Sequence, residues 1–170
     1  MKINKEHYQN KFNELTKEGH IVRSDAGFKI KLFLDKSFAS FLIAKKQATN
    51  NVEPDKIYWL QWSIIIGYYS ILYAAKAAIL KKGYEVKTHM AAQIALGHLL
   101  VPDELEKEDL EILDQAHKII EDEYVKYFED AKKESSIARY SARPTYTERR
   151  VKEILKNSQL FIRKIDAFVN

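Results

Sequence analysis

Residues 62–96 read WSIIIGYYSILYAAKAAILKKGYEVKTHMAAQIAL and are the most informative part of the chain. The apolar run at residues 62–80 predicts a long helix, which two lysines and Gly83 then end; both features are typical of a helix C-terminus. Thr88 is a suitable N-cap for a second, shorter helix from His89 to about Leu100. The stretch therefore predicts a long helix, a glycine corner and a short helix.

The apolar run is nearly long enough to cross a bilayer. Lys76 lies inside it, Ser63 and Ser70 interrupt it, and its tyrosines lie at its centre instead of at its ends. The chain contains no second run of this kind. We therefore expect a central helix that is buried on most sides, and no membrane span.

On both sides of this stretch, apolar residues recur at helical spacing. The expected helices cover residues 3–18, 28–50, 55–82 and 89–100, a fifth that begins near Leu110 and can extend to Tyr140, and a last one capped by Thr147. The polar residues 19–27 are expected to form a loop. With only 5 Gly and 3 Pro, the chain has little turn chemistry for a β fold. The prediction is an all-α protein, an antiparallel bundle of five to six helices without a β-sheet.

Composition limits the class of protein further. A chain of 170 residues with 46 % hydrophobic and 31 % charged residues is long enough for one domain with a real core. Its lack of cysteine excludes a disulfide scaffold, a thiolate metal site and a cysteine nucleophile. The polar start MKINKEHYQNKF is no signal peptide, so we expect a cytoplasmic protein. A net charge of +4 permits a nucleic-acid partner without demanding one.

The central stretch resembles the HEPN family (higher eukaryotes and prokaryotes nucleotide-binding), which has an aromatic and alanine-rich helix, a glycine corner and then Lys-Thr-His. The matching residues here are Tyr68, Tyr69, Tyr73, Ala74, Ala75, Ala77, Ala78, Gly83, Lys87, Thr88 and His89. The likeness extends back through residues 34–48 and forward through residues 138–140 to the final helix. It implies an HEPN-like bundle domain at 28–170 and an N-terminal helical extension at 1–27.

The alanines of the central helix leave little side-chain bulk over one turn, so another helix can approach closely. The neighbouring tyrosines add large flat surfaces with a polar tip. These residues predict a tight helix–helix seam, and the sequence leaves open whether it lies within the chain or between subunits. Because HEPN proteins commonly dimerise, the resemblance implies a homodimer. The candidate seam residues are Tyr68, Tyr69, Tyr73, Ala74 and Ala77.

The ribonuclease motif of catalytic HEPN proteins is absent. Those members act without metal and carry an Arg followed four to six residues later by a His. No arginine here has a histidine at that spacing, and every histidine precedes Arg139. Tyr146 follows Arg139 by seven positions, and its ordinary pKa of about 10 makes it a poor base. We expect a non-catalytic protein without metal or cofactor. The alternative is a divergent ribonuclease that uses Arg139, Arg143 and Tyr146, or a pocket that includes His89.

Two further patterns have functional interpretations. Asp114-x-x-His117 resembles half of a carboxylate-bridged metal site, but His117 falls on the apolar stripe, which favours a core or boundary histidine. Basic and aromatic residues near the C-terminus suit phosphate binding and base stacking, and a solvated helix end is the competing interpretation. The candidate binding residues are Arg139, Tyr140, Arg143, Tyr146, Arg149 and Arg150, with Lys87 and His89.

The resemblance also suggests partners. HEPN domains often accompany a small nucleotidyltransferase in toxin–antitoxin or stress-response systems. The expected partners are therefore a second copy of the chain, an RNA or nucleotide, or a nucleotidyltransferase-type protein. A helical structural adaptor without nucleotide chemistry is the third hypothesis.

Overall fold

The computed structural model describes residues 5–50, 56–101, 103–134 and 148–170, and for residues 57 and 121–134 it describes the backbone alone. These residues form α1 (Lys5–Lys17), β1 (Ile21–Arg23), α2 (Lys29–Ala48), α3 (Lys56–Lys81), β2 (Tyr84–Val86), α4 (His89–Leu99), α5 (Lys107–Glu134) and α6 (Glu148–Val169). The predicted all-α, HEPN-like bundle is confirmed. The proposed start of the last helix at Thr147 and the extension of the fifth to Tyr140 lie outside the described residues.

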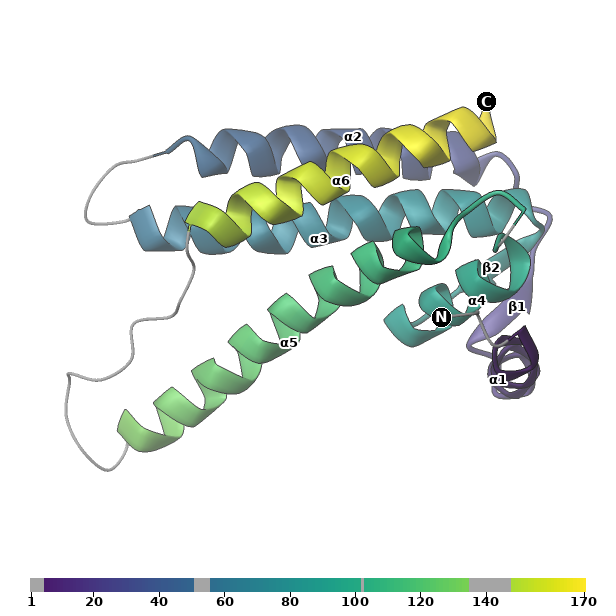
Figure 1. Cartoon of the computed structure of the whole chain (residues 1–170), viewed down its shortest axis with the longest axis horizontal. Helices are drawn as coiled ribbons and strands as arrows, with labels where there is room; N and C mark the ends of the chain where they lie inside the picture. Colours follow the sequence, from purple (N-terminus) through teal and green to yellow (C-terminus); the bar gives the residue numbers. More distant parts are fainter. Residues whose placement is uncertain (1–4, 51–55, 102, 135–147) are drawn as a thin grey trace.

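Helix α3 is the centre of the molecule. It contacts α2, α4, α5 and α6, and α2 and α6 also pack on each other (Figure 1). Ile64, Ile71 and Ile79 of α3 are buried. Among the described residues one helical stretch, Tyr58–Lys81, is long and apolar enough to cross a membrane, and 72 % of its apolar window is buried inside the protein. This burial confirms the predicted central core helix.

Buried serines join the three packed helices. The hydroxyl of Ser37 on α2 donates to the carbonyl oxygen of Ser70 on α3 at 2.7 Å, and Ser63 on α3 donates to the carbonyl oxygen of Ala44 on α2 at 2.7 Å. Ser158 on α6 donates to the carbonyl oxygen of Gly67 at 3.1 Å. Because buried hydroxyl groups need a partner, these contacts fix how α2 and α6 align with α3.

Both local signals around the corner after α3 are confirmed. Gly83 has a φ of 83°, a left-handed conformation that a Cβ would penalise. The side chain of Thr88 accepts a hydrogen bond from the backbone N–H of Ala91 at 3.1 Å, so Thr88 is the N-cap of α4. The corner therefore places His89 at the first position of α4.

The expectation of no β-sheet is wrong, and residues 19–27 are not a loop throughout. β1 pairs with β2 in an antiparallel two-stranded sheet, in which Ile21 faces Val86 and Arg23 faces Tyr84. Three-residue strands are too short to show an alternating pattern in the sequence. The corner at Gly83 returns the chain alongside β1, and this return creates the pairing.

The N-terminal segment shares the core of the bundle. Helix α1 packs on α4, and Phe12, Leu15 and Ile21 belong to the buried cluster. The ring of Phe12 lies 4.4 Å from that of His98 on α4 and 5.2 Å from that of Tyr84 on β2. The division at residue 27 stays a prediction, but residues on both sides of it form one core.

Candidate functional site at the junction of α3, α4 and α5

Three polar rings meet where α3, α4 and α5 come together. His89 begins α4, His117 lies on α5, and their rings stack with centroids 3.6 Å apart and planes 9° apart. The hydroxyl of Tyr68 on α3 lies 3.0 Å from Nδ1 of His89, and the ring of Tyr68 also contacts His117 at 5.9 Å. We refer to Tyr68, His89 and His117 as the histidine cluster.

Burial dominates the electrostatics of His89. Desolvation, followed by the neighbouring His117, lowers the pKa of His89 to about 4, while Asp114 acts in the opposite direction. The carboxylate of Asp114 is itself paired with Lys118 at 2.7 Å. The positive end of the α4 dipole further disfavours a charged imidazole at the first helical position. His89 is therefore neutral at pH 7.

The hydrogen bonding of His89 is incomplete. Its Nε2 is buried and has no hydrogen-bond partner. If the hydroxyl of Tyr68 donates to Nδ1, Nε2 carries an unpaired proton; in the other tautomer Nε2 carries an unpaired lone pair. Either form has an energetic cost, and an unsatisfied buried atom of this kind requires a functional or structural explanation.

Helix α1 reaches the same region. Burial, and then the charge of Asp114, raises the pKa of Tyr8 on α1. Helix α4 also carries His98, whose pKa burial lowers. Burial thus favours the neutral forms of His89, Tyr8 and His98 in this part of the molecule.

This setting limits the chemistry of the cluster. A ribonuclease site needs positive charge beside its histidine to stabilise phosphate, and a general base works best with a pKa near the working pH. With a pKa near 4, His89 is a weak base and carries no charge at pH 7. Among the described residues, no three His, Asp or Glu side chains are grouped so that they could hold a metal ion.

The structure separates the candidate seam residues into two groups. Tyr68, Ala74 and Ala77 are buried inside the chain, so their packing is within the chain. Tyr69 is exposed and Tyr73 is partly exposed. The first group therefore points into the bundle, and the second group points out of it.

The structure describes only part of the candidate binding residues. Lys87 and Arg149 are exposed and Arg150 is partly exposed, whereas Arg139, Tyr140, Arg143 and Tyr146 lie outside the described residues. Arg149 and Arg150 belong to the first turn of α6, beside Glu148, which pairs with Lys56 of α3 at 2.7 Å. The structure brings His89 to the histidine cluster, while Arg149 and Arg150 lie at the start of α6.

Sequence reasoning did not bring His117 and Tyr68 together with His89. In the sequence, Tyr68 is a large flat ring with a polar tip, and His117 is a histidine on an apolar stripe. A histidine on an apolar stripe is the one sign of this cluster in the sequence. A buried polar ring needs hydrogen-bonding partners, and these can come from other helices.

A row of apolar side chains on α3 faces outward. Tyr58, Trp62 and Tyr69 are 56 %, 54 % and 45 % exposed, and Ile65, Ile66 and Tyr73 are partly exposed. Their spacing places these six residues on one face of the helix. We refer to them as the α3 strip.

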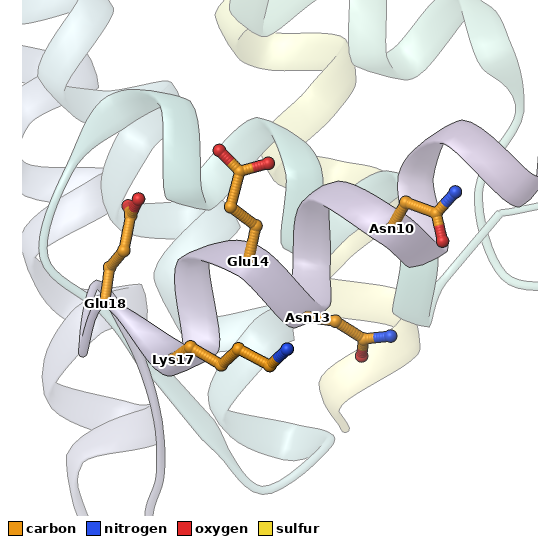
Figure 2. A pocket seen from close by; sticks show the side chains of 5 residues that line it. All are labelled: Asn10, Asn13, Glu14, Lys17 and Glu18. Carbon is orange, nitrogen blue, oxygen red and sulfur yellow. The ribbon is translucent and has the colours of Figure 1, made fainter.

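Figure 2 shows a surface hollow beside α1, which is polar where the α3 strip is apolar. Its lining residues are Asn10, Asn13, Glu14, Lys17 and Glu18. All five are exposed; Asn10, Asn13, Glu14 and Lys17 belong to α1, and Glu18 follows its end. The hollow therefore holds no converging catalytic groups.

Comparison with known proteins identifies the family. The model of the HEPN domain family matches residues 46–167. No curated protein matches the chain. The matched range contains the long central helix, the Gly83 corner, the Thr88 cap and the histidine cluster. Because the match covers well over half of the chain, this protein belongs to the HEPN domain family.

Proposed function

We propose that this protein is a non-catalytic HEPN protein that acts as a homodimer and binds a macromolecular partner. The observation that carries the dimer is the α3 strip, in which three large aromatic side chains are about half exposed. Exposed aromatic residues in a continuous row are typical of protein–protein interfaces.

The order of residues in the α3 strip indicates that a second copy of the chain packs on it. The strip is symmetric about a point between Ile65 and Ile66, with an aromatic residue at equal distances on each side. If two α3 helices pack antiparallel across a two-fold axis at that point, Trp62 faces Tyr69 of the partner subunit and Tyr58 faces Tyr73 of the partner subunit. A two-fold interface requires such self-complementarity.

The strip also has a suitable size. From position 58 to position 73 it spans 15 residues, about 22 Å of helix. Helix α2 widens it at one end, where Phe33 stacks on Tyr73 and the ammonium group of Lys36 lies 5.7 Å from the centre of that ring. An ordinary stable interface buries about 800 Å² per subunit, and the side chains of α2 add to the surface that α3 offers.

The proposed dimer can be tested by placing opposite charges on its two subunits. Wild-type protein should have a mass of about twice 19.9 kDa by light scattering at low micromolar concentration. Ile65→Glu and Ile66→Lys should each give the monomer mass, because each variant brings like charges together near the axis. An equimolar mixture of the two should recover the dimer mass, because Ile65 faces Ile66 of the partner subunit.

Leu160→Glu provides the matched control. Leu160 is an apolar residue that is 52 % exposed, but it lies on α6 outside the α3 strip, so this variant should stay dimeric. A wild-type mass near 20 kDa would reject the dimer. If Ile65→Glu and Ile66→Lys each stay dimeric on their own, the α3 strip is not the dimer interface.

The non-catalytic part of the proposal rests on two observations: the missing Arg–His spacing and the low pKa of His89. Pure protein incubated with total tRNA and mRNA without metal should therefore produce no specific cleavage. Cleavage that disappears in Arg139→Ala and Tyr146→Phe, or in His89→Gln, would instead establish the divergent ribonuclease.

The partner follows from the family resemblance. It is an RNA or a nucleotidyltransferase-type protein, and a toxin–antitoxin or stress-response system is the proposed setting. Arg149, exposed at the start of α6, is available for phosphate contacts. Co-purification from the native host, with an inspection of the neighbouring gene, identifies which of the two partners is present.

A further inference from the structure

The outer face of α6 carries a row of positive charges. Arg149, Lys152, Lys156 and Arg163 follow one another at intervals of three, four and seven residues, which places them on one side of the helix. All four are exposed, whereas the buried residues of α6 lie on its opposite side. From position 149 to position 163 the row is about 21 Å long.

Helix α2 adds a fifth cation near the start of this row. The end of α2 and the start of α6 lie side by side, and with α3 they border a second hollow, of about 400 Å³ (Figure 1). Lys45 of α2 and Lys152 of α6 both line it. The apolar side chains that line the same hollow are Ala48, Leu60, Val151 and Leu155. We refer to Lys45, Arg149, Lys152, Lys156 and Arg163 as the basic row.

The charges of the basic row are not neutralised by neighbouring acids. Within the part of the chain that the structure describes, none of its five cations takes part in an ion pair. Glu148 lies close to Lys152, but its carboxylate is paired with Lys56 of α3 at 2.7 Å. Glu153 is the one acidic residue between positions 149 and 163. The basic row therefore keeps most of its charge for a binding partner.

The side chains of the basic row favour a polyanion over a protein surface. Lysine is depleted in the core of protein–protein interfaces, which use aromatic and apolar anchors. Leu160 is the one large apolar side chain exposed between positions 149 and 163. Phosphate groups need no such anchors, because Lys and Arg bind them through charge and each contact releases a counterion.

We infer that the basic row binds the sugar–phosphate backbone of a single-stranded RNA. This inference rests on the proposed function, which leaves the partner open between an RNA and a nucleotidyltransferase-type protein, and it selects the RNA. The backbone follows α6, and the hollow between Lys45 and Lys152 receives the face of one base on its apolar lining. A base within a duplex is paired and stacked, so the hollow accepts only an unpaired one.

The basic row stays accessible in the proposed dimer. Helix α6 packs on α3 at Gly67, whose carbonyl oxygen accepts the hydroxyl of Ser158 at 3.1 Å. Gly67 lies about half a turn from Tyr69 of the α3 strip, so α6 and the partner subunit contact different sides of α3. Each subunit of the dimer therefore presents its own basic row.

Fluorescence anisotropy with a labelled oligouridine of about 15 nucleotides tests the basic row. Five phosphate contacts should give a slope of log affinity against log salt concentration of roughly −3.5, because each contributes roughly −0.7 on a single strand. The double variant Lys152→Glu, Lys156→Glu removes two contacts, so its slope should be about −2. At about 50 mM salt its affinity should be lower by roughly fiftyfold or more.

The double variant Lys5→Glu, Lys17→Glu is the matched control. Both lysines are exposed on α1, so this variant makes the same change of net charge away from α6 and should bind like the wild type. A blunt RNA duplex of the same length should bind more weakly than the single strand. Circular dichroism and light scattering of every variant monitor its fold and its dimer.

The basic row is overturned if the wild type does not bind the oligouridine, or if the row variant and the control lose equal affinity. It is also overturned if the duplex binds as tightly as the single strand. Wild-type binding that the row variant leaves unchanged would reject this surface and keep RNA as the partner. Light scattering tests the dimer separately, so failure of the basic row and failure of the proposed dimer are distinguishable.

Discussion

Phe161→Ala is expected to lower the free energy of unfolding by about 3–5 kcal/mol. Phe161 is completely buried on α6, the helix that packs on both α2 and α3. Truncation of its ring removes apolar contacts and leaves a cavity that the rigid helices around it cannot fill. Urea denaturation followed by circular dichroism, at one protein concentration because of the proposed dimer, measures the loss.

The neighbouring residue supplies the control. Leu160 is 52 % exposed, so Leu160→Ala should change the free energy of unfolding by less than about 1 kcal/mol. Equal losses for the two variants would mean that α6 does not present Phe161 to the core.

Gly97→Ala is expected to destabilise the protein by about 2 kcal/mol, although alanine is the better helix former. Gly97 lies within α4, where Gly→Ala ordinarily stabilises a helix by about 1 kcal/mol. Here a Cβ would lie 2.3 Å from the ring of Tyr8. An overpacking cost of about 3 kcal/mol exceeds the gain, because Tyr8 must move and α1 with it.

A double-mutant cycle isolates the cause. In a Tyr8→Ala background the clash is absent, so Gly97→Ala should now stabilise the protein by about 1 kcal/mol. The sign of the substitution should thus reverse between the two backgrounds, as measured by thermal or urea unfolding. If Gly97→Ala is destabilising in both, the close approach of Tyr8 to Gly97 is not the reason.

The close approach at Gly97 illustrates what sequence reasoning could not reach. In the sequence, Gly97 is an ordinary residue of an alanine-rich helix, and α1 is only an N-terminal extension. In the structure α1 packs on α4, and Tyr8 lies against Gly97. The same limit applies to the pairing of Ile21 with Val86, since three residues show no period. Contacts between distant segments depend on the packing of the whole chain.

The helices, the Gly83 corner, the Thr88 cap and the family resemblance can all be read from the sequence, because each depends on neighbouring residues or on helical spacing. The packed fold is needed to show which tyrosines of α3 face inward, and to show that His89 lies against His117 across 28 positions of the chain. Burial and ring contacts are properties of several helices packed together. A single helix sets the direction of its side chains, but its neighbours decide which of them meet a partner and which meet water.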